Sequence, residues 1–217
     1  MSFFNDWGSW LPTLLTGLWV SARVAGLSLL LGLPAGLLLA LGSGAKSLPV
    51  RWTVIGLVEL GRGMPALVML QIVYFGLPNA GLTLSALLSS AFAFALTTAA
   101  YTSEILRGGL QAVPAGEVEA AEALGLARRD TLRFIVIPQG IRIAIPPLMG
   151  FAILIFQVTS LAYTIALPEL TSQAYSIGSS SFRYTSVFTL AALLYLAVTI
   201  STSFLTERIE IRLARHL

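Results

Sequence analysis

Residues 63 to 103 read GMPALVMLQIVYFGLPNAGLTLSALLSSAFAFALTTAAYTS and contain no charged side chain. A helix needs about 20 apolar residues to cross roughly 30 Å of hydrocarbon. These 41 residues are therefore too many for one span and enough for two. The sequence Leu77-Pro78-Asn79-Ala80-Gly81 interrupts the run with residues that favour a turn. The run predicts two membrane-spanning helices joined by a short connection.

The composition of the whole chain has the same character. Hydrophobic residues make up 56% of the 217 residues and charged residues only 11%, against roughly 25% charged in soluble domains. This excludes an ordinary soluble enzyme and a disordered chain. Because cysteine is absent and His216 is the one histidine, a disulfide framework, a thiolate metal site and a histidine cluster are excluded as well.

Charge-free runs mark the other spans, at residues 24–45, 143–168 and 184–206. They are continuous and lack the period-2 alternation of barrel strands, which favours helices. We therefore expect an all-α polytopic membrane protein whose single transmembrane domain covers residues 1–217. Its five helices are expected at about 18–41, 54–76, 84–106, 145–166 and 186–206.

The distribution of lysine and arginine predicts the orientation, because cytoplasmic loops carry an excess of both. The tail before the first helix has no basic residue, and the connections after the second and fourth helices have at most one. Basic residues gather after the first helix, after the third and in the C-terminal tail: Lys46, Arg51, Arg107, Arg128, Arg129, Arg133, Arg142, Arg208, Arg212 and Arg215. We expect the N-terminus outside and the C-terminus inside, as five crossings also require.

The predicted cytoplasmic connection 107–144 is far longer than the others and is not disordered in composition. Within it, residues 113–125 read VPAGEVEAAEALG. Pro114 can begin a helix, its acidic residues suit the positive end of the helix dipole, and Gly125 suits its C-terminus. A helix this short is unstable alone in water and needs something to dock against.

One resemblance depends on that segment. Glu119-Ala120-Ala121, then three residues, Gly125, nine residues and Ile135-Val136-Ile137-Pro138 resemble the EAA loop of membrane subunits of ATP-binding-cassette importers. The resemblance implies a coupling helix that sits in a cleft of a cytoplasmic ATPase subunit. The implied ATPase-coupling residues are Glu117, Glu119, Ala120, Ala121, Leu124, Gly125 and Arg128.

Further motifs narrow the resemblance. They are Arg62-Gly63-Met64-Pro65, Tyr74-Phe75-Gly76-Leu77-Pro78, residues 100–109 and Pro138-Gln139-Gly140-Ile141-Arg142. Together they look like the polar amino acid branch of importer permeases, of the histidine, glutamine, arginine and opine type. This implies a type I importer permease fold in the bacterial cytoplasmic membrane, forming half of a translocation path by alternating access.

The same resemblance implies the partners. They are two cytoplasmic ATPase subunits that bind ATP and Mg²⁺, a second permease subunit, an extracytoplasmic solute-binding protein and membrane lipid, with no nucleic acid. The chain itself is expected to catalyse no reaction and to hold no cofactor. Gly42-Ser43-Gly44-Ala45-Lys46-Ser47 lacks the first glycine of a phosphate-binding loop and follows a predicted membrane helix, so we interpret it as a flexible turn.

The fourth predicted helix departs from the family pattern. Where the branch usually has Lys-Asp-Thr-Ser-Leu, this chain has Gln157-Val158-Thr159-Ser160-Leu161. Both charges are missing, and Gln157, Thr159 and Ser160 are left as polar candidates for the path. A charged solute needs compensating groups where water is scarce. We therefore favour a heterodimer, whose other permease supplies the charges, over a homodimer.

Several interpretations stay open at this point. Glu59 with Arg62, and Glu104 with Arg107, are spaced to pair on one helix face. They either solubilise helix ends at the cytoplasmic interface or line a gate beside Gly63 and Pro65. The small residues of 32–36 either pack within the subunit or form a dimer seam, and residues 178–181 are expected to be an external loop. A secondary transporter or channel that uses an ion gradient would explain the helices but not the spacing of the loop motif.

Overall fold

The structure is a computed structural model that describes residues 3–214, and every regular element in that part of the chain is helical. Four unbroken helical runs within it are long and apolar enough to cross a membrane: α1 (Trp7–Ser43), α4 (Ala86–Gln111), the run Arg128–Ile165 that contains α7 (Ile137–Val158), and α9 (Tyr184–Ala214). A bent pair of helices makes a fifth candidate. The expected all-helical class is confirmed, and five spans are confirmed if the bent pair is counted as one. Arg215, one of the basic residues of the C-terminal tail, lies outside the described residues.

The second expected span, 54–76, is wrong as a single helix. α2 (Leu48–Gly63) ends at the break, and the chain turns by 103° into α3 (Ala66–Gln71), the π-helical turn η1 (Ile72–Gly76) and the 3₁₀ turn η2 (Leu77–Ala80). The cause is Pro65, which disfavours helical angles at the residue before it. Met64 accordingly has extended angles, φ −87° and ψ 128°.

The other spans differ from expectation mainly at their ends. α1 begins at Trp7 instead of residue 18, because its N-terminal end packs on later helices and Leu14 is fully buried in a cluster with Leu170 and Val187. α9 also extends beyond 186–206 at both ends, to 184 and 214. Charge-free length therefore underestimated both helices, since it marks only the part of a helix that is apolar throughout.

The connection 107–144 is more helical than expected. α4 continues to Gln111 and α7 begins at Ile137, so the expected limits of 106 and 145 are wrong. Between them lie α5 (Ala115–Ala123), α6 (Arg128–Thr131) and the π-helical turn η3 (Leu132–Val136). Pro138 does not delay α7 because a proline at the start of a helix loses no hydrogen bond.

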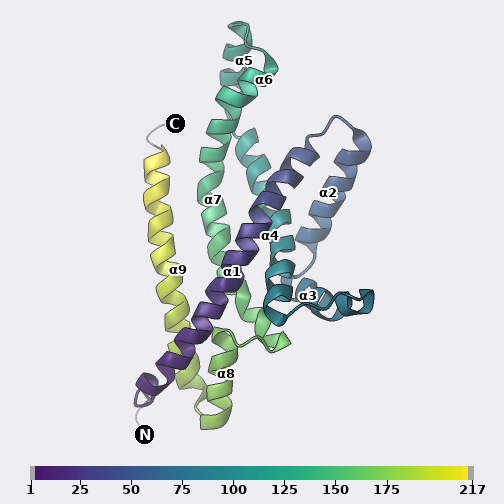
Figure 1. Ribbon diagram of the computed structural model, residues 1–217. Coiled ribbons are helices and arrows are strands. Elements are labelled where there is room, and N and C mark those ends of the chain that lie inside the picture. Colours follow the sequence, from purple (N-terminus) through teal and green to yellow (C-terminus); the bar gives the residue numbers. More distant parts are fainter. Residues whose placement is uncertain (1–2, 215–217) are drawn as a thin grey trace.

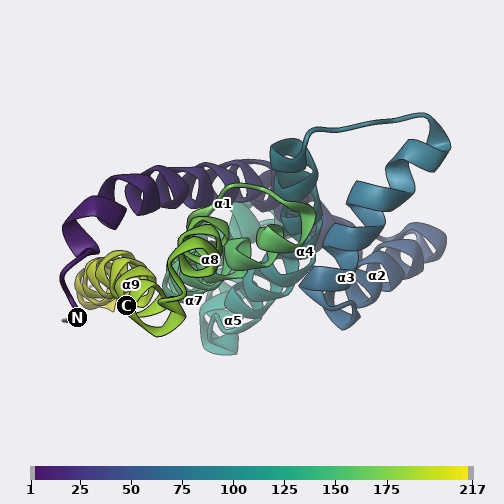
Figure 2. The same ribbon diagram turned by 90° about the horizontal axis from the view of Figure 1, so that it is seen from below.

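Residues 178–181 are not a loop. They form the end of α8 (Leu170–Ser181), which follows the 3₁₀ turn η4 (Thr159–Ile165). Figures 1 and 2 show α8 as a short helix at the same end of the molecule as the N-terminal end of α1. Charge-free apolar length does not reveal α8, because the helix is only 12 residues long and rich in serine.

Small residues let α1 and α4 approach closely. A side-chain carbon added at Gly32 would lie 2.5 Å from Thr98 Cβ, and Gly36 is pressed against Thr102 in the same way. The hydroxyls of Thr98 and Thr102 donate to carbonyls of their own helix, so they need no other partner. The small residues of 32–36 therefore pack within the subunit and do not form a dimer seam in this structure.

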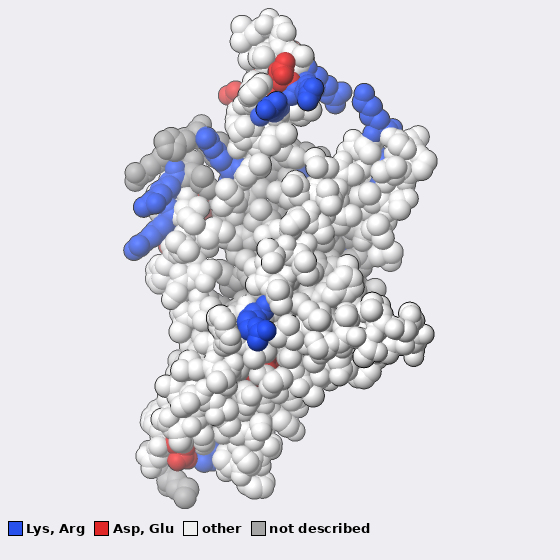
Figure 3. Space-filling model, in the orientation of Figure 1, with Lys and Arg blue, Asp and Glu red and all other residues white. Residues whose placement is uncertain are grey.

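The charged side chains lie mostly at the ends of the elongated molecule. Figure 1 shows the first and last described residues at opposite ends, with α5 and α6 projecting beyond the other helices. Figure 3 shows the basic and acidic side chains grouped near those two ends, with a mostly uncharged surface between them. This distribution fits a chain whose middle lies in hydrocarbon.

Candidate functional site

The projecting helix α5 ends in a fully hydrogen-bonded cap. The Gly125 N–H donates to the Glu122 carbonyl at 2.9 Å, and the Leu126 N–H donates to the Ala121 carbonyl at 3.1 Å. This pair of bonds is the Schellman motif, which requires a left-handed residue after the helix. Gly125 supplies it with φ +76°. The expected helix of two to three turns with Gly125 at its C-terminus is thus present in the structure.

The faces of α5 are used differently. Ala121 is 1% exposed and is enclosed by the chain itself, where α5 meets α6 and η3. Glu117, Glu119 and Ala120 are exposed, and Leu124 is 82% exposed. The expectation that Ala121 faces another subunit is therefore wrong for this conformation, because its side chain fixes α5 to the rest of the chain.

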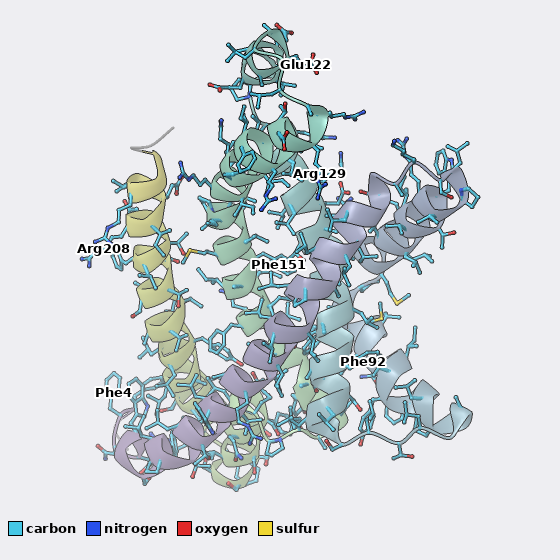
Figure 4. The ribbon with its side chains drawn as sticks, turned by 45° about the horizontal axis from the view of Figure 1, so that its top comes forward. Phe4, Phe92, Glu122, Arg129, Phe151 and Arg208 are labelled. Carbon is cyan, nitrogen blue, oxygen red and sulfur yellow. The ribbon has the colours of Figure 1, made fainter. Side chains whose placement is uncertain are left out.

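Charge also gathers around α5. Arg128 and Arg129 are exposed on the next short helix, α6, and Glu117 lies in the first turn of α5. Figure 4 shows Glu122 and Arg129 at this projecting end of the molecule, far from Phe4 at the other end. The arrangement presents a strongly exposed apolar side chain, Leu124, among charged groups.

The two expected charge pairs form one network. Arg62 Nη1 lies 3.4 Å from Glu59 Oε1 and 3.7 Å from Glu104 Oε2. Arg107 Nη2 lies 2.5 Å from the same Glu104 oxygen, and Arg107 Nη1 donates to Gln111 Oε1 at 2.9 Å. The network therefore connects the last turn of α2 to α4. The Tyr101 hydroxyl adds a second link by donating to the Arg62 carbonyl at 3.2 Å.

A cavity of about 330 Å³ lies next to this network, at the break between α2 and α3. Arg62, Tyr101, Phe151 and Val158 are among its lining residues, and the rings of Tyr101 and Phe151 stack at 5.4 Å. Its volume is in the range of small-molecule sites. Arg62 is the one charged side chain that lines it, so the cavity is mainly apolar with a basic edge.

The three polar candidates from the end of α7 do not gather at this cavity. Thr159 is fully buried, and its hydroxyl donates to the Phe156 carbonyl at 2.7 Å. Gln157 is exposed and Ser160 half-buried, and neither lines the cavity, whereas Val158 does. The expectation that Thr159 presents a polar atom to the path is therefore wrong in this conformation. Val158, the apolar member of the motif, is the one that lines the same cavity as Arg62.

Sequence reasoning missed Glu169, a fully buried carboxylate at the start of α8. It accepts hydrogen bonds from the Ser172 N–H at 2.7 Å and the Thr171 N–H at 2.9 Å, and so caps α8. The hydroxyls of Ser21 at 3.3 Å and Tyr195 at 3.2 Å complete its partners. Glu169 thus joins α1, α8 and α9. The sequence feature that could have indicated this role is an acidic residue directly after Pro168, a position suited to begin a helix.

The chain matches the family model described as "Binding-protein-dependent transport system inner membrane component" over residues 32–215. It is 37% identical over 187 residues to the probable amino-acid ABC transporter permease protein YckA of Bacillus subtilis strain 168, covering 86% of this chain and 83% of that protein. It is 32% identical over 221 residues to the glutamine transport system permease protein GlnP of Escherichia coli K12, covering 96% and 97%. These matches support an importer permease and give no support to an ion-gradient transporter.

Solved structures agree. A chain of the structure titled "Crystal structure of an amino acid ABC transporter with histidines" superposes with a TM-score of 0.93 at 31% identity, covering 96% of this chain and 98% of that one. A chain of the inward-facing MetNI methionine ABC transporter gives 0.72 at 19% identity and shows the shared fold alone. This chain therefore belongs to the family of binding-protein-dependent transport system inner membrane components, the multi-pass permease subunits of bacterial ATP-binding-cassette importers.

Proposed function

We propose that this chain forms half of a membrane pathway that imports an amino acid or a related small polar solute. Two separate ATPase subunits bind ATP and Mg²⁺ and drive the transport, and an extracytoplasmic binding protein delivers the solute. The names of the relatives supply the solute class. The chain itself catalyses no reaction. The observation that carries the proposal is α5, a capped helix that projects from the spanning helices and exposes Leu124.

The proposed coupling surface consists of the exposed residues Glu117, Glu119, Ala120, Leu124 and Arg128. Leu124 fills an apolar depression in the ATPase, and the surrounding charges set the register of docking. Ala121 and Gly125 act within the chain. Ala121 anchors α5, and Gly125 lets the chain reverse direction so that α5 and α6 move together with α7.

The proposed gate lies at the α2–α3 break. Arg62 and Glu104 hold α2 against α4 at the cavity edge, while Glu59 provides a weaker, more exposed contact. A separation of α2 from α4 would open the cavity toward the cytoplasm, so the ion pair stabilises the closed arrangement. Gln157 and Ser160 remain candidates for solute contact in another conformation, since neither side chain is fully buried.

A second permease subunit is needed because one chain of this size does not enclose a polar path. We favour a different chain over a second copy. The cavity has Val158 at its lining and Arg62 as its one charged residue, so two identical halves would offer no acidic group to a cationic solute there. A partner with a charged pair at the equivalent position would supply it.

The proposed orientation places the N-terminus outside and α5 in the cytoplasm, within the inner membrane. It is supported by the basic residues that gather at the α5 end: Lys46, Arg51, Arg128, Arg129 and Arg133.

The test uses the complete transporter reconstituted with its binding protein. Leu124→Asp and Glu119→Lys should leave the amount of membrane-inserted complex unchanged and abolish the stimulation of ATP hydrolysis by the loaded binding protein. Ala123→Ser, at an exposed position on α5, is the control and should leave the stimulation unchanged. Full stimulation in both α5 variants would overturn the coupling assignment.

A further inference from the structure

Arg23 is a charged residue with no partner in the part of the chain that the structure describes. It is exposed, and it is the one charged residue in the 37 residues of α1. Figure 3 shows a basic patch near the middle of the molecule, between the charged groups at its two ends, over the path that α1 takes in Figure 1. An arginine at the edge of the hydrocarbon is stabilised by an anionic group that neutralises it, so this position suits a ligand or a neighbour of opposite charge.

The packing of α1 on α4 gives the depth of Arg23. Ser28 donates to the Ala91 carbonyl at 3.2 Å, and Gly32 and Gly36 lie closest to the carbonyls of Ala95 and Ala99. Each pair differs by 63 in residue number, so the two helices run parallel in constant register. The same difference places Arg23 level with residue 86, where α4 begins.

That level is the outer boundary of the proposed span. Glu104 and Arg107 mark the opposite, inner end of α4. The charge-free run of α1 also starts directly after Arg23, and its 22 residues span about 33 Å of helix, close to the thickness of hydrocarbon. Trp19, 66% exposed, lies one turn further out on the same stripe of α1, at the depth where tryptophan is enriched.

A groove of about 460 Å³ runs beside Arg23, between α1, α7 and α9. Its lining includes Trp19 and Gly26, which lie one turn before and one turn after Arg23 on the same side of α1, and the adjacent residue Ala22. Arg23 therefore sits on its rim. Along α1 the groove extends to both sides of Arg23, outward to Leu15 and inward to Leu29, and Ala152 of α7 lines its inward part.

The surface of the groove is apolar, although two of the residues that line it are threonines. Thr199 and Thr202 line it, but their hydroxyls donate to the carbonyls of Tyr195 and Val198 at 3.0 and 2.9 Å. They therefore present methyl groups. The groove combines a basic group at headgroup depth with an apolar slot that runs toward the middle of the bilayer.

We propose that this groove binds an anionic phospholipid of the outer leaflet, with its phosphate at Arg23 and one acyl chain between α1, α7 and α9. Charge decides against a second copy of the chain as the occupant. Among the described acidic residues, Glu169 is the one near this level, and it is fully buried and bonded to Ser21 on the opposite face of α1. A copy has no acidic side chain to offer Arg23 here.

The test measures lipid retention by the intact transporter, purified from nanodiscs that contain equal amounts of phosphatidylglycerol and phosphatidylcholine. Native mass spectrometry counts the lipids that remain bound. The wild type should retain phosphatidylglycerol in preference, and Arg23→Gln should reduce that retention about fivefold, which corresponds to one basic residue at an anionic lipid surface. Arg51→Gln, at an exposed arginine elsewhere, is the matched control and should change nothing.

A second variant fills the groove. A Cβ added at Gly26 would meet no atom of the chain within 4 Å, and the same holds for Gly56 on α2, far from the groove. Gly26→Leu should therefore lower lipid retention without unfolding the protein, and Gly56→Leu should not. The proposal is overturned if Arg23→Gln retains lipid like the wild type, if both lipids are retained equally, or if Gly26→Leu has no effect. Loss of the second permease subunit from Arg23→Gln would instead assign this face to a protein contact, which also overturns it.

Discussion

Arg62, in the last turn of α2, reaches across to Glu104 of α4, with Nη1 3.7 Å from Oε2. Both carboxylates of the network, Glu59 and Glu104, meet the same guanidinium, immediately before the chain bends by 103° at Pro65. An ion pair at this place joins two helices at the point where one of them is interrupted. The ion pair therefore resists movement of α2 relative to α4. The proposed gate opens by that movement.

Removing this contact should alter transport more than stability. Glu104→Gln leaves Arg62 with Glu59 as its one carboxylate and Arg107 with Gln111 alone, a loss of about 1.5–3 kcal/mol for hydrogen bonds to a charged group. We expect uptake to fall about tenfold or more and basal ATP hydrolysis to rise, because the closed arrangement is less stable. Both are measured in proteoliposomes. Glu59→Gln is the control, since its carboxylate is 65% exposed, and equal effects of the two variants would contradict the gate.

Gly125 should be intolerant of any side chain because of its backbone angle. A Cβ added there would meet nothing within 4 Å, yet φ is +76°, which costs a residue other than glycine roughly 1–2 kcal/mol. Gly125→Ala should loosen the end of α5 and lower coupled ATP hydrolysis. Gly116→Ala, which also meets nothing within 4 Å and has no positive φ, should be neutral. Equal activity of both variants would mean that the cap does not matter for coupling.

The α1–α4 contact should be essential for folding. A side chain at Gly32 would meet Thr98 Cβ at 2.5 Å and the Ala95 carbonyl at 2.9 Å. Gly32→Leu should therefore separate the two helices and lower the yield of membrane-inserted complex severely. Gly8→Leu, where nothing lies within 4 Å, is the control. The measurement is the monodisperse fraction in gel filtration, and a normal fraction for Gly32→Leu would show that the packing differs from that described.

Glu169 predicts a dependence of stability on pH. Burial raises the pKa of this carboxyl above its usual value of 4.5, although the N–H groups of Thr171 and Ser172 and the hydroxyls of Tyr195 and Ser21 oppose the shift. The folded state then binds its proton more tightly than the unfolded state. Protonation of Glu169 therefore raises the free energy of unfolding. This contribution is complete below pH 4.5 and declines as pH rises toward the pKa of the folded state.

The variant Glu169→Gln isolates this effect. It cannot titrate, and it loses one bond of the α8 cap at every pH, a constant offset of about 0.5–1.5 kcal/mol. The difference in melting temperature, wild type minus variant, should therefore be larger at pH 5 than at pH 7.5. Thermal unfolding of the purified complex at both values measures it. A constant difference would mean that the folded carboxyl titrates as it does in water.

The orientation can be tested with single cysteines, since the natural chain has none. Ser180 and Arg129 are both exposed and lie at opposite ends of the molecule. A membrane-impermeant maleimide should label Ser180→Cys in intact cells and Arg129→Cys only after permeabilisation. Reversed accessibility would place α5 outside and remove the proposed contact with the ATPase.

The sequence by itself determined the helical class, the number of candidate spans and the short helix after Pro114 with its glycine cap. These features depend on local properties: uninterrupted apolar length, the restricted angles beside Pro65 and Pro114, and the left-handed angle open to Gly125. Local rules also placed Glu59 near Arg62, because residues three apart share a helix face. None of this requires knowledge of what lies across from a helix.

Only the tertiary structure decided which helices meet. It joined the two charge pairs through Arg62 and Glu104, enclosed Ala121, turned the Thr159 hydroxyl inward and buried Glu169 between three helices. Each of these outcomes depends on contacts between residues far apart in the chain. In an apolar sequence, hydropathy has the same sign on every face and so cannot indicate which face is covered. The choice was made by close packing of small residues and by the need of each buried polar group for a partner.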